Sequence, residues 1–239
     1  MTSIFHTLVS EPLYSGLVFL INSLSFFDVG VVIIIFTIIT KIILLPLSIK
    51  ASKAQLEMKG AEKDLAVIKQ KYTDKTEQGV KVMEYYKEKG INPFSGILVL
   101  IIQLPILIGL YRVFLGLPKI NPDYLYSFIP VPETINMMFL GFVNMAEKSL
   151  VLALLVGIST YIQTSIASSG QNQVSDGSKQ GELAKAMAFQ MKYFLPPFIA
   201  IIVYNISSAV ALYLLVSNTF SILQELYIKR RYHKSIVVV

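Results

Sequence analysis

Long apolar runs without charge alternate with short polar segments along this chain, and the length of each run decides what it can form. Residues 90–111, 149–175 and 193–224 contain no Asp, Glu, Lys or Arg, and residues 29–49 contain only Lys41. A helix that crosses a bilayer needs about 20 apolar residues. The pattern therefore predicts an all-α polytopic membrane protein.

Basic residues indicate which side of the membrane each segment faces, because lysine and arginine collect in cytoplasmic segments. Segment 50–89 carries 10 Lys and 7 acidic residues and is therefore expected inside. The block 193–224 is long for one crossing and has basic residues on both sides, so we divide it in two at Asn205–Ser208. Five spans result, with the N-terminus outside and the C-terminus in the cytoplasm: 29–49, 94–114, 149–168, 187–204 and 208–227.

The segments beside these spans complete a single domain over residues 1–239. Residues 12–27 are apolar but short and interrupted by polar positions, which indicates a helix lying in the outer interface. A frayed extension of the first span is the alternative. Residues 135–146 are too short to cross and are expected to lie at the outer surface or to dip into it. Residues 228–239 form a basic cytoplasmic tail, whose charges are Lys229, Arg230, Arg231 and Lys234.

Segment 50–89 also contains the apolar spacing of a helix–helix contact. A polar break at 73–79 separates its two helical stretches. We predict a cytoplasmic helical hairpin, with Met58, Leu65, Ile68 and Tyr72 along its seam; a solvated linker helix without a partner is the alternative. The first stretch has apolar residues separated by 4, 3, 4, 3 and 4 positions, as in an a/d repeat: Ala54, Met58, Ala61, Leu65, Ile68 and Tyr72.

Composition excludes several classes of protein. The chain is 54% hydrophobic and 15% charged, with a mean hydropathy of +0.62 and no Cys, whereas soluble domains carry about 25% charged residues. A disulfide-stapled secreted module and an ordinary cytosolic enzyme are therefore excluded. The net charge of +6 could suggest DNA, but 17 of the 21 basic residues lie on the cytoplasmic side of the predicted topology. The surplus is expected to face anionic lipid or a ribosome instead.

Polar side chains inside the predicted spans are the candidate functional residues. Lys41 lies nine residues before Lys50, about 13 Å along a helix, so its side chain cannot fully reach the interface. A charge at that depth costs at least ~2.5–3.5 kcal/mol, and the only acid inside a predicted span is Glu225, two residues from the end of 208–227. Lys41 and Gln103 therefore indicate a hydrated cavity, whereas hydrogen bonding between helices explains most Ser and Thr. Pro46 is expected to kink the first span. The candidate site residues are Lys41, Thr37, Gln103, Tyr161, Asn205 and Ser208.

The sequence contains no recognisable set of catalytic residues. The two histidines, His6 and His233, lie near the ends of the chain, and the only acid in a predicted span, Glu225, lies near the cytoplasmic end of 208–227. Metal-ligand clusters and a glycine-rich phosphate loop are absent from the sequence. We therefore expect a protein that is not an enzyme and that carries no cofactor or metal.

Three motifs occur in order along roughly residues 12–231, with the charged segment 50–89 between the first two. They resemble the pattern of the YidC family of membrane protein insertases. Two positions depart from that pattern, because the family usually has Arg at Lys41 and Pro at Ser207. The motifs are Lys41-Ile-Ile-Leu-Leu-Pro46-Leu47, then Asn92-Pro93-Phe-Ser-Gly96 with Ile102-Gln103-Leu104-Pro105-Ile106, and last Ser208-Ala-Val-Ala-Leu-Tyr213 with Ser217-Asn218 and Gln224.

The resemblance implies a five-helix bundle with a hydrophilic groove that opens to the cytoplasm and to lipid. A polar or acidic N-terminal tail of a nascent membrane protein would enter the groove, attracted by Lys41, without an energy source of the insertase itself. The hairpin would contact substrate or ribosome, and the tail would contact ribosome or anionic lipid. A monomer in a prokaryotic plasma membrane, acting alone or with the Sec translocon, is expected. A small channel or solute carrier and a non-inserting assembly chaperone are the alternatives.

Overall fold

The structure is a computed structural model, and it describes residues 7, 10–91, 106, 108–114, 117, 119–168 and 189–236. Most of these residues are helical, as the apolar runs predict. The elements, in chain order, are α2 (Glu11–Ser23), α3 (Val29–Gly60), α4 (Glu62–Lys71), α5 (Lys75–Glu88), η2 (Pro122–Tyr124), β1 (Met138–Phe139), β2 (Val143–Asn144), α7 (Leu150–Ser168), the π-helical turn η4 (Gln190–Phe194), α9 (Leu195–Tyr204) and α10 (Ser208–Ile236).

Two described helices are long and apolar enough to cross a membrane. They comprise Val29–Ala54 within α3 and Ser208–Arg231 within α10, which confirms apolar helices of spanning length at the first and last predicted spans. The shorter apolar helices Leu150–Ile166 and Lys192–Tyr204 lie within the third and fourth predicted spans. The second, 94–114, is described only at 106 and 108–114, where it is helical.

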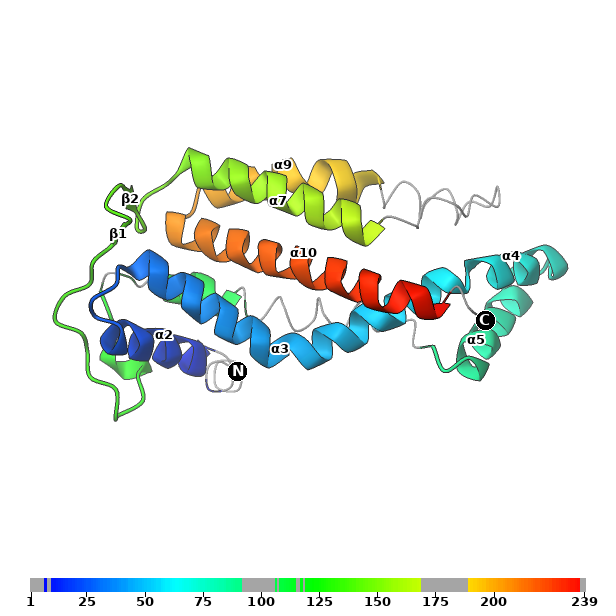
Figure 1. Cartoon of the computed structure of the whole chain (residues 1–239), viewed down its shortest axis with the longest axis horizontal. Helices are drawn as coiled ribbons and strands as arrows, with labels where there is room; N and C mark the ends of the chain where they lie inside the picture. Colours follow the sequence, from blue (N-terminus) through cyan, green and yellow to red (C-terminus); the bar gives the residue numbers. More distant parts are fainter. Residues whose placement is uncertain are drawn as a thin grey trace.

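Helix α10 packs between α3 on one side and α7 and α9 on the other, as Figure 1 shows. Its first turns, Ser208–Tyr213, are buried throughout. This position follows from composition, because small and apolar residues at the start of α10 let neighbouring helices approach closely. A similar approach joins α7 to α9, where a Cβ added at Gly157 would lie 3.1 Å from the Cβ of Ala200.

Helix α2 lies beside the first half of α3 (Figure 1). Leu17 and Val18 on its inner face are fully buried against a core that includes Ile33 and Val113. The helix ends at Ser23, four residues before the predicted end at 27. A turn follows, and it leaves Phe26 three-quarters exposed.

Two predicted spans differ in detail from the structure. Helix α3 continues beyond residue 49 to Gly60 and contains Pro46. Its ribbon bends along its length (Figure 1), as expected where a proline removes one backbone hydrogen bond. The fourth predicted span, 187–204, is not one regular helix, because its described part begins with the π-helical turn η4 before α9 starts at Leu195.

Helices α4 and α5 follow α3 at the end of the molecule opposite to β1 and β2 (Figure 1). The predicted seam from Ala54 to Tyr72 is interrupted at Ala61, where α3 gives way to α4 after Gly60. The predicted polar break at 73–79 is shorter, because α5 begins at Lys75. Asp74 caps that helix by accepting hydrogen bonds from the backbone N–H groups of Thr76 and Glu77.

Helices α4 and α5 contact one another through polar as well as apolar groups. The Tyr85 hydroxyl donates to Asp64 at 2.6 Å, and the Gln78 side chain donates to the carbonyl oxygens of Lys69 and Tyr72. Of the four predicted seam residues, Leu65 is buried, Ile68 and Tyr72 are half-buried, and the side chain of Met58 lies outside the described residues.

Residues 135–146 form a tight antiparallel turn, with Met138 opposite Asn144 in β1 and β2. The turn is fastened to the start of α3. Asp28 accepts hydrogen bonds from the backbone N–H groups of Val31 and Leu140, and Leu140 adopts a φ of 50°, which is rare outside glycine. Gly30 permits the contact, because a Cβ there would lie 2.2 Å from the Phe139 ring.

Large apolar side chains face outward along the helices. Burying one such side chain gains about 1.5–3 kcal/mol in water, so a continuous exposed set indicates apolar surroundings. The set includes Ile38, Ile39, Ile42 and Ile43 on α3, Leu150, Val151, Leu154, Leu155 and Ile158 on α7, and Phe198, Ile201 and Ile202 on α9.

Candidate functional site

A line of polar side chains follows α10 through its apolar surroundings and contacts both neighbouring helices. We call it the α10 polar seam and define it by Asn218, Ser221 and Gln224 on α10 with their partners on α3 and α7. The three α10 residues are three positions apart, so they lie on successive turns of one helix side. Their partners are Ser159 and Thr160 on α7 and Lys41 and Ser48 on α3.

The α7 side of the seam is held by Asn218. Its side-chain amide donates to Ser159 Oγ at 3.0 Å and to Thr160 Oγ1 at 2.9 Å. Both hydroxyl residues are buried. Ser159 Oγ also donates to the carbonyl oxygen of Val156, so its own proton is bonded within α7. These bonds fix the rotation of α10 against α7.

The α3 side of the seam contains the charged group. Lys41 is half-buried, and its Nζ donates to Ser221 Oγ at 3.2 Å. Ser221 in turn donates to the carbonyl oxygen of Ser217, 2.9 Å away. No carboxylate within the described ranges lies at ion-pair distance from Lys41. The Lys41 ammonium group is thus hydrogen-bonded to a neutral hydroxyl, and no described carboxylate neutralises its charge among the apolar helices.

Further along α10 the seam continues toward the basic end. The Gln224 amide donates to Ser48 Oγ at 2.7 Å. Lys229 donates to the carbonyl oxygen of Ile166 and lies 3.8 Å from a Glu225 carboxylate oxygen. Polar contacts therefore join α10 to both neighbours over several turns.

The structure brings only part of the predicted site together. Thr37 is fully buried one turn before Lys41, and its hydroxyl donates to the carbonyl oxygen of Ile33 at 2.6 Å within its own helix. Tyr161 is exposed on α7, with its ring 6.1 Å from that of Tyr193. Gln103 lies outside the described residues.

Asn205 and Ser208 lie at the other end of α10. Ser208 precedes Ser221 by 13 residues, about 20 Å along a helix. Its hydroxyl donates to the Glu147 carbonyl oxygen at 2.7 Å, and Asn205 Oδ1 accepts from Lys148 Nζ at 3.5 Å. Both residues therefore fasten the start of α10 to the segment before α7.

The residues predicted for the basic tail differ in their surroundings. Lys229 is half-buried against α7, whereas Arg230 is exposed. Arg231 donates to the Tyr227 hydroxyl at 2.7 Å. The side chain of Lys234 lies outside the described residues.

Sequence reasoning missed Ser221 and did not assign Asn218 and Gln224 to the site. Their spacing carried a signal, because three polar residues at i, i+3 and i+6 in an apolar helix share one side. Across the residues that the structure describes, no group of three His, Cys, Asp or Glu could hold a metal ion.

Apolar helices of spanning length, outward apolar faces and an internal polar seam are typical of a helical membrane protein. The chain belongs to the YidC family, since the family model described as 60Kd inner membrane protein matches residues 20–235. A relative from Fusobacterium nucleatum named membrane protein insertase YidC is 31% identical over 219 residues, which are 90% of this chain and 94% of that protein. A relative of the same name from Clostridium perfringens is 27% identical over 213 residues, with 87% and 83% covered.

A solved structure is also similar. It is a crystal structure of an active YidC insertase with the first transmembrane domain resolved, and it matches with a TM-score of 0.53 at 21% identity. The match covers 89% of this chain and 45% of that chain. This likeness concerns the fold alone.

Proposed function

We propose that this protein is a membrane protein insertase, which passes nascent membrane proteins into the bilayer of a prokaryotic plasma membrane. Family membership supports this role, as does the naming of its relatives as insertases. The observation that carries the mechanism is Lys41, a half-buried cation whose Nζ contacts only a neutral hydroxyl among the described residues.

The proposed mechanism is electrostatic and uses no energy source of the protein. Lys41 attracts the polar or acidic N-terminal tail of a substrate into a hydrophilic groove that opens to the cytoplasm and to lipid. The attraction between two unit charges 4 Å apart is on the order of 4 kcal/mol at an effective dielectric of 20. The apolar segment of the substrate then moves into lipid along the outward apolar faces of the helices.

The topology belongs to the same proposal. Five spans place the N-terminus outside and the C-terminus in the cytoplasm, and α4 and α5 form the cytoplasmic hairpin. The position of α4 and α5 opposite to β1 and β2 supports this arrangement (Figure 1). A monomer would use the hairpin to contact substrate or ribosome and the basic tail to contact ribosome or anionic lipid, alone or with the Sec translocon.

Insertion into proteoliposomes tests the proposal. A single-span substrate with an acidic N-terminal tail is compared with one that has a neutral tail, and protease-protected tails are scored. Lys41→Met should lower insertion of the acidic substrate more than that of the neutral one, and Lys41→Arg should retain activity because the charge remains. Lys50→Met is the matched control, because it removes an exposed charge from the same helix.

Three outcomes contradict the proposal. Equal insertion of acidic and neutral tails by the wild type and Lys41→Met would refute the electrostatic role of Lys41. Absence of protected tails with the wild-type protein would refute the insertase role and favour a non-inserting chaperone. Release of a trapped small solute from the same vesicles, without protected tails, would favour a channel.

A further inference from the structure

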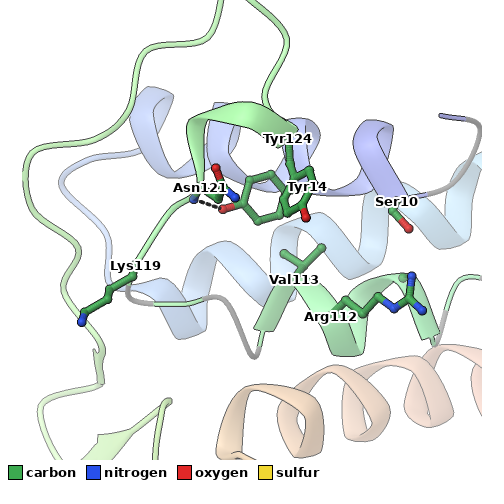
Figure 2. A pocket seen from close by; sticks show the side chains of 8 residues that line it. Ser10, Tyr14, Arg112, Val113, Lys119, Asn121 and Tyr124 are labelled. Atoms are coloured by element: carbon green, nitrogen blue, oxygen red, sulfur yellow. Dashed lines mark hydrogen bonds between the residues drawn. The ribbon is translucent and has the colours of Figure 1, made fainter. Parts of the chain in front are cut away.

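A cavity of about 350 Å³ lies between the start of α2 and the helical residues 108–114. The segment 119–124 covers one side of it (Figure 2). The cavity is separate from the α10 polar seam, and none of the seam residues lines it. Nothing in the proposed function uses it.

The covering segment is fastened to α2 by several contacts, so the cavity has a defined shape. The Tyr14 hydroxyl accepts a hydrogen bond from the backbone N–H of Asn121 at 2.8 Å, and the rings of Tyr14 and Tyr124 meet edge to face, 6.1 Å apart (Figure 2). Ser15 Oγ accepts from the backbone N–H of Tyr126 at 3.1 Å. Tyr14 and Tyr124 form an aromatic wall.

The residues that line the cavity carry positive charge, as in a site that binds an anion. Arg112 and Lys119 contribute two cations, and the described residues that line the cavity include no Asp or Glu. Figure 2 shows the Arg112 guanidinium and the Ser10 hydroxyl at the same end of the cavity, away from the aromatic wall. Arginine suits a phosphate group because its planar guanidinium donates parallel hydrogen bonds to two oxygens.

Ser10 supplies an independent observation. The residue is 9% exposed, and its Oγ has no hydrogen-bond partner among the described residues. A buried hydroxyl without a partner is unfavourable. An acceptor oxygen inside the cavity would satisfy it. One end of the cavity therefore contains a guanidinium group and a hydroxyl without a described partner, and the other end has an aromatic surface.

We propose that this cavity binds the phosphate ester of an anionic phospholipid. The Arg112 guanidinium and the Ser10 hydroxyl donate to phosphate oxygens, and the glycerol ester region lies against Tyr14, Tyr124 and Val113. A lipid fits better than a free anion because the cavity combines the cationic end with apolar walls. The site would fasten α2 to the helix at 108–114 through a bound lipid.

The absence of Trp from the chain gives a direct assay. In a Tyr124→Trp background, the single indole reports occupancy while the detergent-solubilised full chain is titrated with dihexanoylphosphatidylglycerol. We expect saturable binding, weakened about tenfold or more by Arg112→Gln and by Ser10→Ala, as expected for hydrogen bonds to a charged group. Ser10→Ala should fold normally, because it removes an unpartnered hydroxyl.

Matched controls separate the site from general attraction. Arg230→Gln removes an exposed arginine elsewhere, and Ser165→Ala removes another buried hydroxyl without a described partner; both should leave the affinity unchanged. Equal weakening by Arg112→Gln and Arg230→Gln, or unchanged affinity in Ser10→Ala, overturns the proposal. Saturation by inorganic phosphate with the same dependence on Arg112 overturns the choice of a lipid. If Arg112→Gln does not fold, Arg112→Lys replaces it, and unchanged affinity in that variant counts against a bidentate contact.

Discussion

Replacing Asn218 by alanine should separate α10 from α7 in a measurable way. The side-chain amide makes two hydrogen bonds to buried hydroxyls, at 3.0 Å to Ser159 and 2.9 Å to Thr160. Hydrogen bonds between membrane helices contribute about 0.6 kcal/mol on average and up to about 1.7. Two such bonds give an expected loss of about 1 to 3 kcal/mol in the free energy of unfolding.

The loss can be divided between the two partners by double-mutant cycles. Ser159→Ala and Thr160→Val are each combined with Asn218→Ala, and unfolding is followed in mixed micelles as the denaturing detergent is increased. Each cycle should give a coupling energy of about 0.5–1.5 kcal/mol. Thr219→Val is the control, because Thr219 is exposed and its hydroxyl donates to Leu215 within its own helix.

The reasoning fails if both coupling energies are zero while Asn218→Ala still destabilises the protein. The loss would then come from a packing defect and not from the hydrogen bonds. It also fails if Thr219→Val costs as much as Asn218→Ala, because the effect would then be general to polar residues on α10. A coupling confined to one partner would assign the contact to that partner alone.

Three further predictions concern the turn and the α4–α5 pair. Gly30→Ala should loosen the β1–β2 turn, since its Cβ would lie 2.2 Å from Phe139, and addition of Phe139→Ala should restore stability in a thermal melt. The hydrogen bond to Asp64 raises the pKa of Tyr85 to about 12. This hydrogen bond stabilises the folded state below pH ~10, and its contribution is lost as the pH rises through 12. The difference in helix melting between wild type and Tyr85→Phe should therefore vanish above pH 12. Backbone N–H groups in the first turn of α5 lower the pKa of Asp74; this contribution is present above pH ~4 and lost as the pH falls through the lowered pKa. Asp74→Ala should therefore speed amide exchange in that turn at pH 7, with no difference from wild type at strongly acidic pH.

The long helices could be predicted from the sequence because the length of a charge-free apolar run is a local property. Segment 208–227 contains no charge before Glu225, and α10 begins at Ser208. The sequence also contained a local pattern for the start of α5, but the polar composition of 73–79 favoured a break between helices. Asp74 followed three residues later by Glu77 is a common helix-start pattern, and an exposed helix tolerates polar residues throughout.

Contacts between distant segments could not be predicted in the same way. Lys41 was visible as a lone charge in an apolar run, but its partner Ser221 lies 180 residues away. Which residue it meets depends on the rotation of α3 against α10, and one residue of rotation moves a side chain by about 100°. The turn at 135–146 depends in the same way on Asp28, which lies 112 residues from Leu140.

The choice of a hydroxyl as the partner of Lys41 bears on the proposed mechanism. A carboxylate at Ser221 would neutralise the charge and form a strong, specific pair inside the bundle, and an incoming acidic tail would then have to displace it. A hydrogen bond from an ammonium group to a neutral hydroxyl is weaker than one to a carboxylate, so a substrate carboxylate can replace Ser221 with a net gain. Under the proposed function, Ser221→Asp should therefore keep the fold and suppress insertion of acidic tails, although it leaves Lys41 in place. Ser221→Ala should retain insertion, because the charge stays available.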